Sequence, residues 1–417
     1  MVVSVRLAVA LLCSGLAVTA CGRVGFGTDL LHLDAGLRDA ATAEAGLDGA
    51  PPELDAGGAD AGAPSRPAQL GLGDYLSCAR FETASPQCWG WSSDGQVGDG
   101  ATIDRASPVV VAMLGSDVQD IAAGGKHACA ISTGGAVRCW GDNAHGQLGD
   151  ATTTDSATPV VVAGIADAVE LALGTSHTCV RRTGGAVSCW GYNMRGQLGD
   201  STTVESSVAV AVTGLADATA ITAGDAHACA LRAGGSVVCW GTDIAGQLGD
   251  GGSGSSSTPV AVMGVSDAVE IDAGKDFTCV RRATGELACW GRNESGELGT
   301  GTTGTERTPV PVMGIVDADR LVAGGWHACA RHVGGAVSCW GWNSRGQLGD
   351  GTRGTSRAPI DATAIVDAAS LFAGAEHDCI IAADGHVACI GGNYYGELGD
   401  GTTTPSGTLV PVAFAAP

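Results

Sequence analysis

The sequence is poor in basic charge and in the motifs of known catalytic sites. Of its 417 residues, 22 are Lys or Arg and 44 are Asp or Glu, which gives a formal net charge of −22. Such a surface would repel phosphate backbones, so we expect no nucleic-acid partner. Nucleophile-elbow, P-loop and metalloprotease motifs are missing, and Ser, His and Asp recur without a unique constellation. We therefore expect no enzymatic activity and no cofactor.

The chain also lacks a long apolar run. The run from Leu7 to Val18 is too short to span a bilayer, but it follows the single charged residue Arg6 and has the length of a signal-peptide core. The next residues, Val18-Thr19-Ala20-Cys21-Gly22, resemble the lipobox of bacterial lipoproteins. This resemblance implies that residues 1–20 are a signal peptide and that Cys21 becomes the lipidated first residue. An ordinary signal peptide with an accidental cysteine is the alternative.

Residues 21–67 are dominated by Ala, Gly, Asp and Pro. A segment with so little bulky apolar content cannot bury enough surface to offset the entropy of ordering it. We interpret it as a flexible tether between Cys21 and a compact domain at residues 68–417. In the lipoproteins that the start of the chain resembles, a residue such as Gly22 in place of aspartate favours sorting to the outer membrane. We therefore expect an exported protein, held by its lipid alone at the outer membrane or cell surface.

What the chain has in abundance is one repeat. A Cys-Trp-Gly step first occurs at Cys88-Trp89-Gly90 and ends in a degenerate copy at Cys389-Ile390-Gly391, with a spacing of 51 residues once and 50 thereafter. The intervening copies end at Gly141, Gly191, Gly241, Gly291 and Gly341. A period of this length is typical of a solenoid or a propeller, in which each unit buries its apolar face only by stacking on its neighbours.

Each unit contains four short β-rich runs separated by Gly, Asp and Thr turns. In one unit we place them at Pro159 to Val162, Ala168 to Leu173, His177 to Arg181 and Ala186 to Trp190. No part of the repeat is long or periodic enough to indicate a helix. The pattern predicts antiparallel strands in series and an all-β fold.

The unit resembles the repeat of the regulator of chromosome condensation family. The shared positions are Gly174, His177, Trp190-Gly191, Asn193 and Gly196-Gln197-Leu198-Gly199. The resemblance covers about residues 68–417 and recurs seven times. Members of that family fold as seven-bladed β-propellers, so the resemblance implies this fold, with four-stranded antiparallel blades.

The number of strands suggests how such a ring would close. The chain has seven Cys-x9-Cys hairpins and seven strands of the Pro-Val-x-Val type. No such strand precedes the first hairpin, and no hairpin follows the last strand, Leu409 to Phe414. We therefore expect the N- and C-terminal segments to share one blade, which would leave no open edge.

Fourteen of the sixteen cysteines belong to these hairpins. If each hairpin turns through three residues, Cys129 and Cys139 lie opposite each other, whereas a two-residue Gly134-Gly135 turn would separate them. We expect a disulfide within every hairpin, as suits an exported protein, with free buried thiols and a metal site as alternatives. The pairs are Cys78 and Cys88, Cys129 and Cys139, Cys179 and Cys189, Cys229 and Cys239, Cys279 and Cys289, Cys329 and Cys339, and Cys379 and Cys389.

The metal alternative rests on His127, which lies two residues before Cys129 and could join the two cysteines as a zinc ligand. Phe277 and Leu76 replace this histidine in two units that keep both cysteines. We therefore favour a core histidine whose ring nitrogens bond backbone groups, and expect no metal. The aspartate of the Leu-Gly-Asp-Gly steps is interpreted as turn chemistry, because one carboxylate is far short of the roughly 6 to 8 oxygens of a calcium site.

The short loops between Trp-Gly and Gly-Gln/Glu-Leu-Gly differ from unit to unit. Aromatic residues make up 4% of the chain, yet five of the twelve outside the recurring Trp-Gly step lie in these loops. Equivalent loops of a propeller lie on one face and ring its centre, and this composition is typical of a protein-binding hot spot; chance drift of loop residues is the alternative. The expected binding residues are Trp91, His145, Tyr192, Met194, Arg195, Arg292, Trp342, Arg345, Tyr394 and Tyr395.

These observations favour a monomeric binding or scaffold module, tethered to a surface, whose loop face engages a protein, peptide or glycan. The alternatives are guanine-nucleotide exchange, as in eukaryotic members of the resembling family, and a secreted hydrolase or lyase on a propeller scaffold. Exchange requires a cytosolic GTPase and usually a projecting element, whereas this chain is predicted to be exported and its repeats keep one length. An exported member of the same repeat family that inhibits β-lactamases is an analogue for a pure protein binder.

Overall fold

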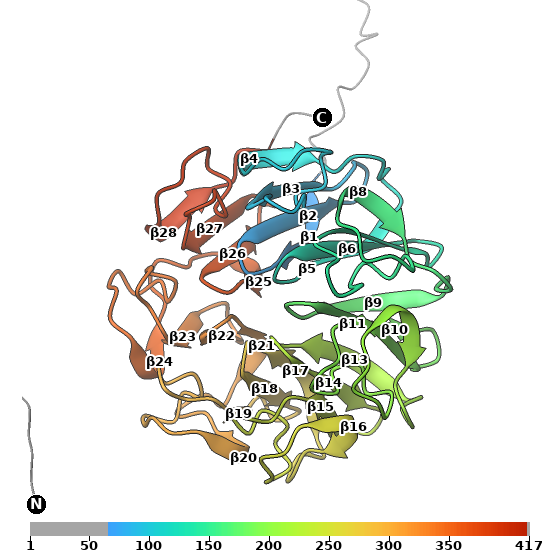
Figure 1. The fold of residues 1–417 in the computed structure, drawn as a ribbon. Coiled ribbons are helices and arrows are strands. Elements are labelled where there is room, and N and C mark those ends of the chain that lie inside the picture. Colours follow the sequence, from blue (N-terminus) through green and yellow to red (C-terminus); the bar gives the residue numbers. More distant parts are fainter. Residues whose placement is uncertain (1–65, 415–417) are drawn as a thin grey trace, which may run out of the picture. The chain divides into compact units, whose positions relative to one another are not determined.

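The computed structural model describes residues 66–414, which form seven four-stranded antiparallel sheets arranged in a ring (Figure 1). The expected all-β, seven-bladed propeller is confirmed. None of the described segments is a helix that could cross a membrane. The predicted signal peptide, Cys21 and nearly all of the predicted tether lie outside the described residues.

Each blade consists of four consecutive strands of four to six residues. The innermost strands are β1 Pro67–Leu72, β5 Val118–Ala123, β9 Ala168–Leu173, β13 Ala218–Ala223, β17 Ala268–Ala273, β21 Ala318–Ala323 and β25 Ala368–Ala373. The second strands are β2 Leu76–Phe81, β6 His127–Ser132, β10 His177–Arg182, β14 His227–Arg232, β18 Phe277–Arg282, β22 His327–His332 and β26 His377–Ala382. The third strands are β3 Gln87–Gly90, β7 Val137–Gly141, β11 Val187–Gly191, β15 Val237–Gly241, β19 Leu287–Gly291, β23 Val337–Gly341 and β27 Val387–Gly391. The outermost strands are β4 Arg105–Val110, β8 Ser156–Val161, β12 Ser206–Ala211, β16 Ser256–Ala261, β20 Glu306–Pro311, β24 Ser356–Asp361 and β28 Ser406–Pro411.

The hairpin of the second and third strands has the predicted register. Cys129 is paired directly with Cys139, and the backbone N–H of Ser132 donates to the carbonyl of Ala136 at 2.9 Å, so the turn spans three residues. Gly135 has a φ of 82°, a conformation that costs glycine little. All seven cysteine pairs form disulfides, with Cα atoms 4.0 to 4.1 Å apart. The predicted intra-hairpin disulfides are confirmed.

The prediction that the two chain ends share a blade is wrong. The Pro-Val-x-Val strand is the fourth strand of its own unit, because Cys139 of β7 pairs with Val160 of β8. The last strand, β28, correspondingly pairs with β27. In the first blade the place assigned to the C-terminal strand is taken by β4, which pairs with β3. Each blade is therefore continuous in sequence.

Seven apolar clusters lie between neighbouring blades and close the ring. One of them joins Leu198 and Val212 of the third blade to Ile221 and Trp240 of the fourth. The seventh cluster joins the last blade to the first in the same way, through residues such as Leu398 and Trp89. Because each sheet buries both faces against neighbours, stacking supplies most of the apolar burial.

A tryptophan of each blade, except the last, also holds the blade before it. The indole N–H of Trp240 donates to the carbonyl of Gln197 at 2.8 Å, and Trp89 donates to the carbonyl of Glu397 at 2.8 Å across the seam. The same bond is made by Trp140, Trp190, Trp290 and Trp340. Ile390 stands in this position in the last blade and keeps only the apolar contact. The recurring Trp thus explains the Cys-Trp-Gly step as an inter-blade clasp.

Candidate binding face

The predicted loops and the turns between first and second strands lie at the same end of every blade. This follows from antiparallel pairing, and a backbone bond ties the two segments together in all seven blades. In the first blade the N–H of Trp91 donates to the carbonyl of Tyr75 at 2.8 Å, and in the sixth the N–H of Trp342 donates to the carbonyl of Trp326 at 2.8 Å. We call this end the loop face.

The loop face holds every tyrosine of the chain and every tryptophan outside the inter-blade clasp. Five of these residues come from the predicted loops, and Tyr75 and Trp326 come from the turns before the second strands. Sequence reasoning missed the latter two because it considered only one of the two segments that meet at this end. The signal was available, since the residue preceding the recurring histidine varies from unit to unit as freely as the loops do.

Two linked groups form an aromatic arc over the sixth, seventh and first blades. In one group, Trp342 packs edge-on against Trp326 at a centroid distance of 5.8 Å. The guanidinium of Arg345 lies 5.5 Å from the ring of Trp342 and 4.7 Å from that of Tyr394. Tyr394 is 48% exposed. A guanidinium between two aromatic faces is held rigidly by cation–π attraction, and here Glu376 also binds it at 3.2 Å.

The second group begins at the next residue, Tyr395. Its ring lies 5.4 Å from Tyr75 and 5.9 Å from Trp91, and Tyr75 also meets Trp91 edge-on. The ammonium of Lys126 extends over the Trp91 ring at 5.2 Å and is exposed. The structure therefore brings together five of the predicted residues, Trp91, Trp342, Arg345, Tyr394 and Tyr395.

The other predicted residues are spread over the rest of the loop face. His145 and Tyr192 form a separate pair with centroids 4.8 Å apart, and His145 also contacts Glu205 at 3.0 Å. Arg292 is engaged by neighbouring carboxylates. Met194, at 63% exposure, extends from the same loop as the exposed Arg195.

The centre of the loop face is the mouth of an axial channel with a water-accessible volume of about 150 Å³. The turns between the first and second strands line it, so the predicted loops lie farther from the axis than expected.

Lys275 binds Asp74 of the first blade at 2.7 Å and also lies 4.9 Å from the Trp326 ring. Burial alone would lower the pKa of Lys275, but the adjacent Asp74 raises it, so the ammonium stays charged. This ion pair ties the fifth blade to the first and adjoins the aromatic arc.

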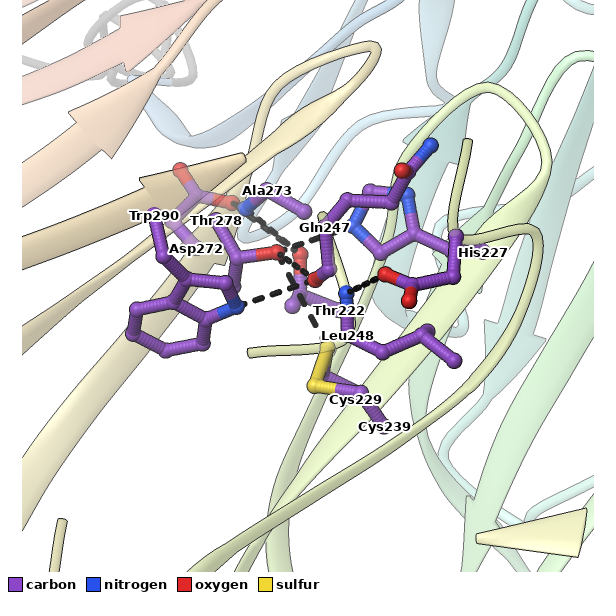
Figure 2. The surroundings of a disulfide bond; sticks show 11 residues. Thr222, His227, Cys229, Cys239, Gln247, Leu248, Asp272, Ala273, Thr278 and Trp290 are labelled. Carbon is purple, nitrogen blue, oxygen red and sulfur yellow. Dashed lines mark hydrogen bonds between the residues drawn. A yellow bond between two sulfur atoms is a disulfide. The ribbon is translucent and has the colours of Figure 1, made fainter. Parts of the chain in front are cut away.

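Within residues 66–414 the cysteines that neighbour the buried histidines are paired in disulfides, so their sulfurs are not free thiolates for a metal. The expectation that the ring nitrogens of these histidines bond backbone groups is wrong. His227 Nε2 lies 2.9 Å from the hydroxyl of Thr278 in the next blade, beside the Cys229–Cys239 disulfide (Figure 2). A buried cluster of His327, Cys329 and Asp378 has metal-ligand spacing, yet the sulfur is committed to a disulfide and His327 binds Asp378 at 2.9 Å.

The fold and this face define a class: a repeat-built, disulfide-bonded β-propeller with one aromatic end. The chain belongs to the regulator of chromosome condensation (RCC1) repeat family. One model of that repeat matches residues 88–131, 134–181, 184–231, 234–281 and 284–331. A second model of the same repeat matches residues 118–147, 168–197, 218–247, 268–297 and 319–347. The resemblance noted in the sequence is confirmed.

Known relatives share the repeat over short stretches. The chain is 39% identical to the ultraviolet-B receptor UVR8 of Arabidopsis thaliana over 72 residues, 17% of this chain and 16% of that protein. It is 34% identical to the E3 ubiquitin-protein ligase HERC2 of Homo sapiens over 98 residues, 23% of this chain and 2% of that protein. The matched stretches thus span a small part of these relatives.

Solved structures match over most of the ring. Prp20p of Saccharomyces cerevisiae, described with its binding properties to Gsp1p and histones, superposes with a TM-score of 0.70 at 18% identity, covering 84% of this chain and 88% of that one. Human WBSCR16 superposes with a TM-score of 0.68 at 20% identity, covering 75% and 86%. At these identities the likeness establishes the fold.

Proposed function

We propose that this protein is a non-catalytic, exported binding module that captures a protein or peptide on the aromatic arc of its loop face. The observation that carries the proposal is the gathering of all tyrosines and all non-clasp tryptophans at one end of the ring. Trp, Tyr and Arg dominate the energetic centres of protein interfaces, because they bury large areas with little loss of conformational freedom. The seven disulfides are consistent with an oxidising, extracellular environment.

The arrangement of the arc supports a peptide-bearing partner. Its rings are preorganised by edge-on packing and by Arg345, so a partner would find the side chains already ordered. Preorganisation reduces the entropy lost on binding. Prp20p, a propeller of the same fold, has binding properties to Gsp1p and histones. Protein capture is therefore in keeping with what this scaffold does elsewhere.

The first experiment is capture of partners from the native surface by the purified exported protein, with a Trp342→Ala/Tyr394→Ala double variant as the comparison. We expect the captured partner to bind the double variant at least about tenfold more weakly, since truncating hot-spot residues typically costs ~2 kcal/mol or more. The melting temperature should stay nearly constant, because both side chains lie at the surface.

The matched control is Val333→Ala, on the turn at the opposite end of the same blade as Trp342. Val333 is 70% exposed, so its truncation removes exposed apolar surface at the opposite end of the blade without touching the arc. Equal binding by the wild type and the double variant, or an equal loss in the control, would place the interface elsewhere.

We further propose that the module is held at a membrane surface through a lipid on Cys21. The lipobox-like residues 18–22 and the apolar-poor segment behind them support this. Metabolic labelling with a fatty-acid analogue should tag the wild type and leave Cys21→Ser unlabelled; equal labelling would rule out the anchor.

A further inference from the structure

In four blades, one buried asparagine amide folds the loop between the third and fourth strands. In the sixth blade, Asn343 Nδ2 donates to the Asp350 carboxylate at 3.1 Å and to the carbonyls of Thr352 and Gly354 at 3.3 and 3.1 Å. Its Oδ1 accepts from the N–H of Leu348 at 3.0 Å. Asn143, Asn193 and Asn393 make the same set of bonds. The amide therefore joins three oxygens of the loop through one donor group.

The fourth blade has an aspartate at this position. Asp243 is 0% exposed, and its Oδ1 accepts from the N–H of Leu248 at 3.0 Å, as the asparagine oxygen does in the sister loops. Its Oδ2 takes the place of the amide nitrogen and has no hydrogen-bond partner. The equivalents of the three acceptors are Asp250 and the carbonyls of Gly252 and Gly254. By its position in the repeat, an oxygen therefore stands where the sister loops have a donor to these three acceptors.

The nearby charges do not cancel. Burial raises the pKa of Asp243, the Asp250 carboxylate raises it further, and Arg307 of the next blade opposes both. Arg307 is exposed and donates to the carbonyl of Gly252 at 2.8 Å, so it supplies one positive charge near two carboxylates. Leaving a buried carboxylate oxygen unpaired is costly, and either a cation or a proton must offset that cost.

We propose that the loop of residues 243–254 binds a calcium ion through Asp243 Oδ2, the Asp250 carboxylate and the carbonyls of Gly252 and Gly254. Carboxylate and carbonyl oxygens are the ligands that calcium prefers, at about 2.3 to 2.6 Å. In the sister loop the Asn343 amide nitrogen lies 3.1 to 3.3 Å from the three equivalent oxygens, and Asp243 Oδ2 stands in the place of that nitrogen. Residues 251–255 are exposed, so water can complete the coordination shell.

The site adds a second carboxylate, that of Asp243, to one of the Leu-Gly-Asp-Gly aspartates considered from sequence alone. In the sixth blade Asp350 is bound by Thr352 and by the amide of Asn343, whereas Asp250 accepts from the N–H of Gly252 at 2.7 Å and has no amide donor at position 243. The site is independent of the aromatic arc, so it would be a structural ion site irrespective of what the loop face binds.

The chain itself offers the matched control, Asp243→Asn, which restores the residue found in five sister loops. Isothermal titration calorimetry of the purified protein with calcium chloride, after removal of metal by chelator, should give one bound ion in the wild type and none in Asp243→Asn. At calcium concentrations about 100-fold above Kd, the melting temperature of the wild type should rise by roughly 4 °C, and that of the variant should not change.

A gain-of-site variant provides the second test. Asn343→Asp places the same carboxylate above Asp350 and should raise the stoichiometry from one ion to two. Equal calcium binding by the wild type and Asp243→Asn would overturn the proposal. A second result would also overturn it. In that result the wild type binds neither calcium nor magnesium, and its stability rises relative to that of Asp243→Asn as the pH falls from 8 to 5, because Asp243 then holds a proton in place of the ion.

Discussion

The buried residue that opens each second strand varies together with the side chain it meets in the next blade. His127, His227 and His377 meet the hydroxyls of Thr178, Thr278 and Ser77, and His327 meets Asp378. Phe277 and Leu76 replace the histidine where the corresponding residues are Ala328 and Ala128, in the same apolar clusters. This position thus holds either a polar pair or an apolar pair, because a buried polar group needs a hydrogen-bond partner.

His177 breaks this rule, and it leads to the first prediction. Its Nε2 has no partner, and the corresponding residue of the next blade is the buried Ala228. Ala228→Thr would supply the hydroxyl found at Thr178 and Thr278. We expect the free energy of unfolding to rise by about 1 kcal/mol, as measured by denaturant titration at neutral pH. The control is Ala328→Thr, opposite Phe277, which adds an unpaired hydroxyl and should destabilise; equal effects of both changes would refute the pairing rule.

A buried glutamate gives a pH-dependent prediction. Glu397 occupies the position of Gln347 in the previous blade, and burial raises its pKa from 4.5 to about 7. Between pH 4.5 and about 7 the carboxyl group of Glu397 is ionised in the unfolded chain but protonated in the folded one, so the wild type loses stability as the pH rises. Glu397→Gln keeps the oxygen that accepts from the N–H of Tyr395 and removes the ionisation.

We therefore expect Glu397→Gln to be more stable than the wild type by about 3 kcal/mol at pH 8, and the two to converge near pH 4. Thermal unfolding across this pH range measures the difference. The reverse change, Gln347→Glu, should create the same pH dependence in the sixth blade. A stability difference that does not vary with pH would show that Glu397 ionises normally.

At the scale of one element, each disulfide-bonded hairpin is a self-contained unit. The two cysteines lie in the apolar layer against the next blade, as Cys229 and Cys239 do, and the crosslink closes only a short local loop. Chain-entropy estimates for such a loop give roughly 2 to 3 kcal/mol. The stabilisation is thus distributed in seven small increments around the ring.

Replacing both Cys229 and Cys239 by serine should lower the free energy of unfolding by about 3 kcal/mol while retaining the β-rich circular-dichroism spectrum. Intact-mass analysis of the wild type should give a value about fourteen hydrogens below that of the reduced protein, from the bridges of the structure. A mass at the reduced value, or loss of all folded signal in the variant, would contradict this account.

The same elements show what could be predicted locally. The equal spacing of the cysteines favoured the three-residue turn and so the correct register of the hairpin, because side chains on a strand alternate faces with a period of two. The assignment of the Pro-Val-x-Val strand to a blade was wrong, since a periodic sequence can be divided into units at any point. Only the pairing of Cys139 with Val160 establishes where one blade ends and the next begins.

At the scale of the whole molecule, the last and first blades are joined by the same kinds of contact as all the other neighbouring blades. The first turns form a belt of backbone bonds, in which Asp74 donates to Gly124 and, at the seam, Ala375 donates to Gly73. The clasp of Trp89 on Glu397 repeats the clasps inside the ring. A strand shared between the chain ends is therefore unnecessary for closure.

One contact is particular to the seam, and it gives the last prediction. The ring of Phe414 packs edge-on against Phe81 at 5.3 Å and Trp89 at 5.6 Å. Phe414→Ala should lower the free energy of unfolding by about 1 to 2 kcal/mol, as expected for a partly buried aromatic side chain. Denaturant titration of the wild type and the variant measures the change. An unaltered stability would show that the repeated contacts alone hold the seam.

The sequence by itself indicated the all-β class and favoured a disulfide within each hairpin, because these follow from the repeated short β-rich runs and from the alternation of side chains along a strand. The number of blades came from the seven copies of the repeat together with the family resemblance. It also pointed to most of the aromatic arc through the loops that vary. The tertiary structure alone decided which strand completes each blade, that Tyr75 and Trp326 join the arc, and that Asp243 Oδ2 is buried without a hydrogen-bond partner. Those outcomes depend on which chain segments meet in space, and a repeating pattern leaves that choice open because every unit offers the same surfaces to its neighbours.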